Sequence, residues 1–241
     1  MKRIFTLAFL VLWSLPLQAQ QPFDPTLAAV RIKSHGASGT VIGTTKGKTW
    51  ILSCCHMFMG HGDQLDAALL QKRLVMDGPQ QPDAVLKGVA SSRVLAYDAK
   101  LDLSLIELDN GPFYCIPVAP AAHKAGRLVS IGYDSMTWPV TLKAASFLGS
   151  AGTTTYTREK PWHGRSGGGL IDVDGAVLFG VVQGYEVAGR ERGLYVSLDG
   201  ILIFLRRHRP ALLQIQIQVP VPAPKLFYQF PAPGGVCPPS R

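Results

Sequence analysis

Short apolar segments, separated by turns rich in glycine and proline, recur along most of this chain of 241 residues. Segments of this length, bounded by turn residues, are typical of β-strands rather than helices. They lie at residues 28–33, 40–43, 49–54, 84–89, 94–97, 104–108, 128–131, 141–147, 169–173, 177–183 and 193–196. Many short strands with frequent turns predict an all-β barrel or sandwich rather than alternating β-α-β units.

Two segments interrupt this pattern with helical character. Residues 63–72 mix polar and apolar side chains, which indicates at most a short helix. Residues 197–207 predict a better one, because Ser197 can cap its start, Asp199 suits its positive end and arginines occupy its last turn. This helix must end by Pro210, since proline cannot continue a helix.

The N-terminus has the layout of a secretory signal peptide. A basic pair, Lys2 and Arg3, precedes an apolar run over residues 4–15. A break at Pro16 and a small residue at Ala19 provide a cleavage point. The run is shorter than the roughly 20 residues that a membrane helix needs. We therefore predict that residues 1–19 are removed on export and that the protein is secreted or periplasmic, without stable insertion in a membrane. An uncleaved anchor is the alternative.

Composition divides the remaining chain. A stretch rich in proline and alanine at 117–125 predicts a connection between two lobes. Residues 220–241 contain repeated prolines and little charge, which predicts an extended tail outside the core. The folded region would then be 20–219, with lobes at about 27–118 and 126–208.

Charge and ligand patterns exclude some functions without naming a partner. The net charge of +8 permits attraction to acidic surfaces but identifies none. Basic residues are scattered apart from Arg206, Arg207 and Arg209, and no nucleic-acid-binding signature occurs, so we expect no nucleic-acid binding. Segment 54–61 holds two cysteines and two histidines but lacks the separated ligand pairs of a zinc site. We expect no metal and no cofactor, and nothing in the sequence indicates an oligomeric state.

Gly164-Arg165-Ser166-Gly167-Gly168 is the most informative segment. A nucleophilic serine needs surrounding backbone that can approach a substrate carbonyl and direct N–H groups at it. Flanking glycines permit the unusual dihedral angles and remove obstructing side chains. Taken alone, the motif is equally compatible with a glycine-rich structural loop.

The rest of the chain offers a base and a carboxylate for this serine. A serine hydroxyl needs a base, and His56 directly follows a predicted strand. The histidine needs a carboxylate to fix its tautomer, and Asp102 opens another predicted strand. Asp98 is the alternative carboxylate. The order His, Asp, Ser is that of chymotrypsin-type enzymes.

In this order, the segments resemble a trypsin-like peptidase domain of the chymotrypsin fold, closest in style to bacterial HtrA/Deg-type proteases. The resemblance runs from about residue 28 to 205. Ser53-Cys54-Cys55-His56 is similar to the family's Thr-x-x-His, and Asp102-Leu103-Ser104-Leu105 to its Asp-Leu-Ala-Leu. Residues 164–169 resemble the nucleophile loop, with Gly169 where proline is usual, and 193–196 resemble the closing strand. The resemblance implies two six-stranded antiparallel β-barrels followed by a C-terminal helix.

The chain departs from the family at two places. Digestive trypsin-like enzymes have Asp before the serine, and it pairs with a newly cut N-terminus on activation. Arg165 stands there, and no Arg-Ile-Val-Gly-Gly start exists, so we expect no such zymogen switch. We expect the Arg165 side chain to point outward into solvent. The alternative is a cation beside the oxyanion site that helps to bind acidic groups. HtrA proteins usually carry a PDZ domain after the protease, whereas this chain continues into the proline-rich tail.

The resemblance implies roles for individual residues. Ser166 would attack the substrate carbonyl, His56 would transfer the proton and Asp102 would orient His56. The N–H groups of Gly164 and Ser166 would form the oxyanion hole. The substrate cleft would be lined by Lys160, Val182, Gln183, Gly184 and Gly193, and Lys160 would favour an acidic side chain.

The function expected from these roles is a serine endopeptidase acting on polypeptides. Two alternatives use the same fold: a catalytically silent binding module, and an esterase-type hydrolase using the same triad.

Overall fold

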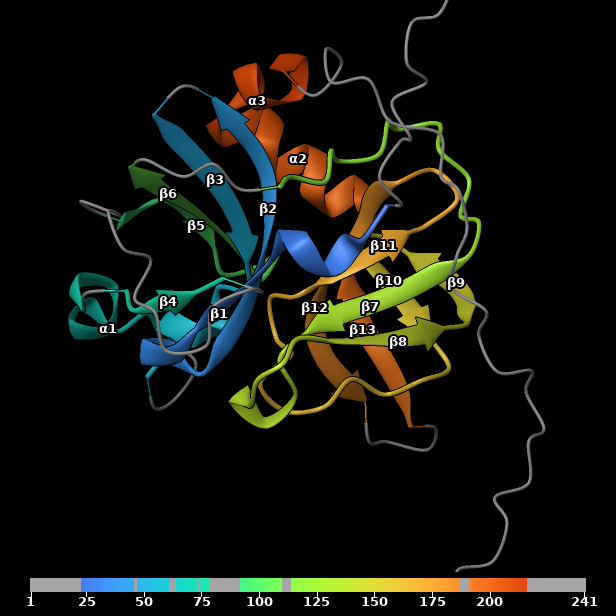
Figure 1. The fold of residues 1–241 in the computed structure, drawn as a ribbon, viewed down its shortest axis with the longest axis horizontal. Coiled ribbons are helices and arrows are strands. Elements are labelled where there is room, and N and C mark those ends of the chain that lie inside the picture. Colours follow the sequence, from blue (N-terminus) through green and yellow to red (C-terminus); the bar gives the residue numbers. More distant parts are fainter. Residues whose placement is uncertain are drawn as a thin grey trace, which may run out of the picture.

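The computed structural model describes residues 23–45, 47–60, 64–72, 74–78, 92–109, 114–186 and 191–215. The predicted signal peptide (1–19), the predicted tail (220–241) and the predicted strand at 84–89 lie outside the described residues. Within them, the chain forms two antiparallel β-sheets that lie side by side (Figure 1). The prediction of an all-β double barrel is confirmed.

The first sheet has six described strands in the spatial order β4-β1-β2-β3-β6-β5. All neighbouring strands pair in the antiparallel sense. Their bounds are β1 Ala29–Ile32, β2 Ala37–Thr45, β3 Lys48–Ser53, β4 Met76–Asp77, β5 Ser92–Asp98 and β6 Leu103–Asp109.

The second sheet has seven described strands in the order β8-β7-β11-β12-β13-β10-β9. Their bounds are β7 Leu128–Gly132, β8 Thr141–Ala145, β9 Phe147–Ala151, β10 Thr154–Thr157, β11 Gly169–Asp172, β12 Val177–Glu186 and β13 Arg192–Val196. These strands are also antiparallel to their neighbours.

The second sheet has seven described strands, whereas the family resemblance implied six. β10 was not among the predicted strands, and the segment predicted as a single strand at 141–147 is divided at Ser146. β8 pairs with β7 on one side of this residue, and β9 pairs with β10 on the other. The Ser146 N–H donates to the Glu159 carboxylate at 2.5 Å, and its carbonyl accepts from Arg158 N at 3.0 Å. Ser146 is thus a corner where the chain passes from one edge of the sheet to the other.

Three α-helices accompany the sheets. α1 (Ala67–Gln71) is shorter than the segment predicted at 63–72. α2 (Leu198–His208) begins where predicted, and the Ser197 hydroxyl caps it by accepting from Gly200 N at 3.3 Å. α2 ends before Pro210, as predicted. A further helix that the sequence did not predict, α3 (Pro210–Ile215), starts at this proline, because proline fits the first turn of a helix.

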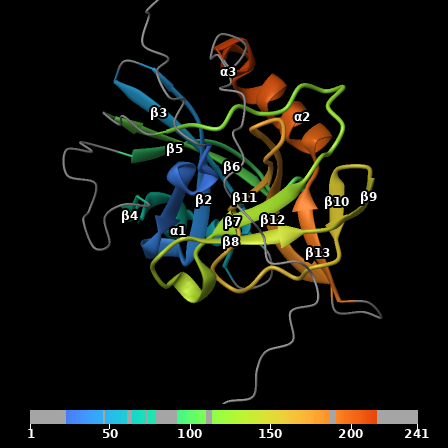
Figure 2. The same cartoon turned by 45° about the vertical axis from the view of Figure 1, so that its right-hand side comes forward.

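The connection between the sheets is bonded to both of them. Ile116 N donates to Val41 O of β2 at 2.9 Å, and Leu178 N of β12 donates to Pro117 O at 2.8 Å. Both views place α2 and α3 at one end of the molecule (Figure 2). None of the helices within the described ranges is long and apolar enough to cross a membrane.

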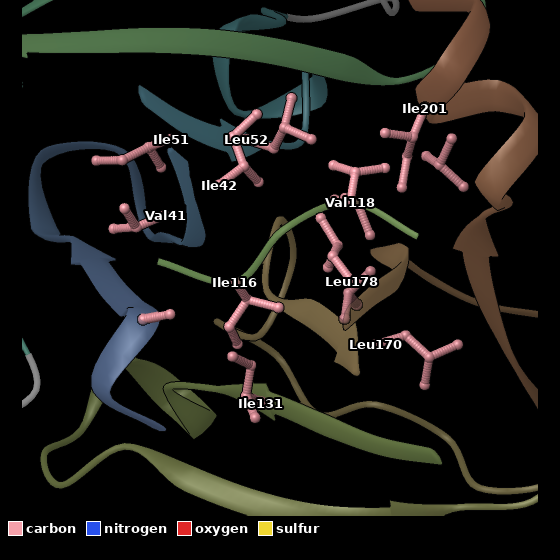
Figure 3. Close-up of a cluster of buried hydrophobic side chains, with 14 of the residues drawn as sticks. Val41, Ile42, Ile51, Leu52, Ile116, Val118, Ile131, Leu170, Leu178 and Ile201 are labelled. Carbon is pink, nitrogen blue, oxygen red and sulfur yellow. The ribbon is translucent and has the colours of Figure 1, made fainter. Parts of the chain in front are cut away.

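A single apolar core joins the two sheets (Figure 3). It contains residues of the first sheet, the second sheet, the connection and α2, so it holds the two lobes in a fixed relation. Fully burying one such aliphatic side chain contributes roughly 1.5–3 kcal/mol. The labelled members are Val41, Ile42, Ile51, Leu52, Ile116, Val118, Ile131, Leu170, Leu178 and Ile201.

Candidate active site

His56 and Asp102 meet where β3 ends and β6 begins. Asp102 directly precedes β6, and its Oδ2 lies 2.8 Å from His56 Nδ1. Its Oδ1 accepts hydrogen bonds from the backbone N–H groups of Cys55 at 2.9 Å and His56 at 2.8 Å. A carboxylate can only accept, so Nδ1 carries the proton. His56 Nε2 therefore keeps a lone pair that can receive a proton.

The carboxylate of Asp98, the alternative partner, is engaged elsewhere. It accepts from Leu101 N at 3.1 Å and from Arg207 Nη1 at 2.9 Å. Asp98 thus closes the turn that leads to Asp102, whose φ of 54° lies in the left-handed region that Asp tolerates better than most residues. The structure brings Asp102, and not Asp98, to His56.

The Ser166 loop is anchored to both sheets. Ser38 N, in β2, donates to Ser166 O at 2.8 Å, and Gly167 N donates to Val182 O, in β12, at 2.8 Å. The Ser166 side chain is half-buried. Its hydroxyl makes no hydrogen bond to a described residue.

Gly167 places this loop beside the histidine. Its φ is +82°, and a Cβ on it would lie 2.2 Å from Ser53 Oγ and 2.8 Å from Cys54 N. These two residues closely precede His56 in the chain. The backbone next to Ser166 therefore touches the backbone next to His56, although no hydrogen bond joins Ser166 and His56 themselves.

We expect Gly167→Ala to lower the free energy of unfolding by about 3 kcal/mol, because the new methyl group would meet backbone and the φ would be strained. Activity should fall at least about 100-fold through misplacement of the serine. Denaturant unfolding and kcat/KM would measure both effects. Gly184→Ala is the matched control for stability, since its Cβ would meet nothing within 4 Å. Equal stability of the two variants would contradict the prediction.

Two backbone donors lie free at the same loop. The N–H groups of Gly164 and Ser166 have no acceptor among the residues that the structure describes. The His163 carbonyl is held by Ser135 N at 2.5 Å, and the planar trans peptide therefore directs Gly164 N–H to the opposite side. Ser38 Oγ fixes the next peptide by donating to Gly164 O at 2.8 Å. Free donors beside a serine hydroxyl suit an oxyanion.

A family model described as a trypsin-like peptidase domain matches residues 37–181, more than half of the chain. The match contains His56, Asp102 and Ser166. The chain belongs to the trypsin-like peptidase family. It is a serine peptidase, a hydrolase, as predicted. No curated protein sequence matches it.

Solved structures agree with this family in fold. The active form of the Rv3671c protease from M. tuberculosis is 17% identical, with a TM-score of 0.54, and the match covers 77% of this chain and 82% of that chain. The inactive form of the same protease is 18% identical, with a TM-score of 0.53, and covers 77% and 90%. At such identities the likeness establishes the chymotrypsin-like fold.

The predicted pocket residues of this trypsin-like peptidase fall into two groups. Lys160 and Gly193 lie together, because a Cβ on Gly193 would lie 2.5 Å from Glu159 O. Lys160 Nζ lies 3.8 Å from the ring centre of Tyr185 and 3.4 Å from Glu191 Oε1. Lys160 is therefore a partly exposed cation over an aromatic ring.

The other group follows β12. The backbone of Val182 holds the Ser166 loop, since its N donates to Gly168 O at 2.8 Å and its O accepts from Gly167 N. Gln183 reaches toward the start of β6, with Nε2 at 3.5 Å from Leu101 O. At Gly184 nothing lies within 4 Å of where a Cβ would be, so that backbone is open.

The pKa values of His56 and of the adjacent Cys55 are shifted for different reasons. Burial raises the pKa of Cys55 to about 12, and the neighbouring Asp102 adds to the rise. This thiol therefore stays protonated and is a poor nucleophile or metal ligand. Burial lowers the pKa of His56, but the hydrogen bond to Asp102 and the negative charge of that carboxylate raise it, and the net shift is upward. Among the described residues, no group of three or more His, Cys, Asp or Glu is placed to hold a metal.

The expectation that Arg165 points into solvent is wrong: its side chain is fully buried. Arg165 Nε donates to Asp134 Oδ1 at 2.8 Å, and Nη1 donates to Ser130 O at 2.6 Å. Nη2 donates to Thr141 Oγ1. Asp134 lies 31 residues earlier in another loop, so no local signal pairs the two residues.

Proposed function

We propose that the protein is a secreted or periplasmic serine endopeptidase with His56, Asp102 and Ser166 as its catalytic triad. The observation that carries the proposal is the 2.8 Å contact between His56 Nδ1 and Asp102 Oδ2, next to a serine loop with free N–H groups. This contact leaves Nε2 as the base that an alcohol nucleophile needs.

The residues act in a definite order. Ser166 Oγ forms a bond to the carbonyl carbon of the substrate while His56 Nε2 takes the proton of the serine hydroxyl. Gly164 N–H and Ser166 N–H bind the resulting oxyanion, at roughly 3 kcal/mol for each donor. The C–N bond then breaks as His56 returns the proton to the leaving amine. A water molecule then attacks the acyl carbon while His56 takes its proton. The bond from this carbon to Ser166 Oγ breaks, His56 returns the proton to Ser166, and the second product leaves as a carboxylic acid.

The location follows from the N-terminal sequence. The basic pair, the apolar run over 4–15 and the small residue Ala19 support export and cleavage. Polypeptides outside the cytoplasm would be the substrates.

Labelling with a fluorophosphonate probe tests the proposal, because the probe reacts only with an activated serine. We expect the wild type to be labelled at Ser166 and to cleave an unfolded polypeptide. If the folded wild type is not labelled, the protein is a catalytically silent binding module and the proposal is wrong. If the wild type is labelled and hydrolyses esters but cleaves no peptide, the protein is an esterase that uses the same triad.

Substrate preference should depend on Lys160. Its partner Glu191 is exposed, and exposed ion pairs contribute little, so a substrate carboxylate can replace it. We expect cleavage-site profiling to show Asp or Glu before the cut bond. Lys160→Met should lower kcat/KM for such substrates about 10-fold, whereas Lys48→Met, at the end of β3 away from His56, should not. A preference for aliphatic or basic residues would contradict this assignment.

The pH dependence should follow the raised pKa of His56. The base works only when neutral, so a raised pKa moves the acid limb of kcat/KM upward. We expect activity to keep rising above pH 7, with the midpoint above the ordinary value of 6.5. The contribution of this pair to folding has the opposite trend: it is complete below pH 6.5 and is lost as the pH rises through the raised pKa. A midpoint at or below 6.5 would contradict the prediction.

A further inference from the structure

Arg165 stands between the two residues whose N–H groups are free. Whatever holds its side chain also sets the position of Gly164 and Ser166. The hydrogen bonds of its guanidinium to described residues all come from one segment, which runs from β7 to β8 and supplies Ser130, Asp134 and Thr141. A buried guanidinium needs a charged partner, because leaving it unpaired is costly.

Asp134 is that partner and is held in its charged form. Burial alone would raise the pKa of this carboxyl. The hydrogen bonds from Arg165 and Lys143 lower the pKa by more than burial raises it, so the net shift is downward. Lys143 Nζ lies 2.7 Å from Oδ2, and Thr141 Oγ1 donates to the same oxygen at 3.0 Å. The carboxylate is thus fixed on both oxygens while Oδ1 faces Arg165.

The same segment also holds the backbone of the nucleophile loop. The short 3-10 helix η4 (Asp134–Met136) provides Ser135 N, which binds the His163 carbonyl at 2.5 Å. A Cβ on Gly164 would lie 2.6 Å from Met136 N, so the two segments are in direct contact. Ser135 and Met136 have φ values of 49° and 58°. Strained residues of this kind persist where their surroundings over-determine them.

We propose that the Arg165–Asp134 ion pair positions the Gly164 and Ser166 N–H groups for oxyanion binding, and that it does so without a free N-terminus. The proposal rests on the proposed function. In digestive trypsin-like enzymes an acid before the serine pairs with a new N-terminal amine. Here the polarity is reversed, and both charges come from the interior of the chain. The oxyanion site is then complete as soon as the chain has folded.

Asp134→Asn tests the charge with little change of shape. Oxyanion donors act on the transition state, so we expect kcat to fall about 10- to 100-fold while KM changes less than about 3-fold. Rates are normalised to folded protein by its unfolding signal. The affinity for a tetrahedral peptide boronate should fall by the same factor as kcat/KM, and the affinity for a product peptide should not. Asp134→Glu should recover part of kcat.

A matched control and a second variant keep the test decisive. Asp174→Asn breaks the exposed Arg127–Asp174 pair on the same sheet and should leave kcat unchanged. If Asp134→Asn does not fold, Arg165→Lys keeps the charge but not the forked contacts, and it should show the same separation of kcat from KM. Unchanged kcat in either variant would overturn the proposal, as would equal changes in kcat and KM.

Independence from the N-terminus gives a separate measurement. Wild-type protein with an uncleaved N-terminal tag should have a kcat within about 2-fold of the protein without it. A kcat that requires a free N-terminus would overturn the proposal. These failures differ from a failure of the proposed function, in which wild-type Ser166 would not be labelled at all.

Discussion

Ser166→Ala is expected to lower kcat on the order of a million-fold, because the acyl-enzyme then has no atom to form on. The fold should be unaffected. The hydroxyl of Ser166 has no hydrogen-bond partner among the described residues, and the surrounding backbone is held by Ser38 and Val182. The melting temperature should therefore change by less than about 2 °C.

Steady-state kinetics, probe labelling and thermal unfolding of the same preparation measure these effects. Ser150→Ala is the matched control, since this hydroxyl binds Thr155 on the outer strands β9 and β10. It should keep full activity and labelling. Residual peptidase activity in Ser166→Ala above the level of a contaminating protease would mean that another residue is the nucleophile.

Asp102→Asn is expected to lower kcat/KM by about 10,000-fold at neutral pH. The amide oxygen can still accept from Cys55 N and His56 N, so the turn keeps its geometry. The amide nitrogen then faces His56 Nδ1 and donates to it. This forces the proton of the imidazole onto Nε2, where the base is needed.

Asp98→Asn distinguishes the two carboxylates of this region. The Asp98 side chain binds Leu101 N and Arg207, so its neutral form should weaken the turn but keep activity within several-fold of wild type. The two variants should have very different rates. If Asp98→Asn lost most of its activity and Asp102→Asn lost none, then Asp98, and not Asp102, would be the carboxylate that orients His56.

Local sequence signals predicted most of the described strands, although they missed β4 and β10. His56 and Asp102 lie at strand ends, where the alternation of apolar residues stops, and Ser166 lies among glycines that a tight loop requires. These are short-range properties, so the chain displays them directly. The Ser197 cap of α2 was predictable for the same reason.

Features that depend on distant parts of the chain were not predictable. Arg165 looks like a surface residue in its own segment, and only contact with Asp134 and Thr141 explains its burial. The corner at Ser146 depends on the Glu159 carboxylate from the next turn. Helix α3 begins at a residue that locally signals an end. At Arg165 and Ser146, a contact with a distant residue decides between two conformations that the local sequence allows.

The close approach of Gly167 to Ser53 and Cys54 has an evolutionary consequence. With the proposed triad, the first half of the chain would carry the base, His56, and the second half the nucleophile, Ser166. Neither half can be selected for catalysis by itself. A substitution that moves the backbone at Gly167 must be compensated by one near Ser53 and Cys54. Substitutions at this contact between the two sheets should therefore co-evolve in pairs, while the outer strands remain free to diverge.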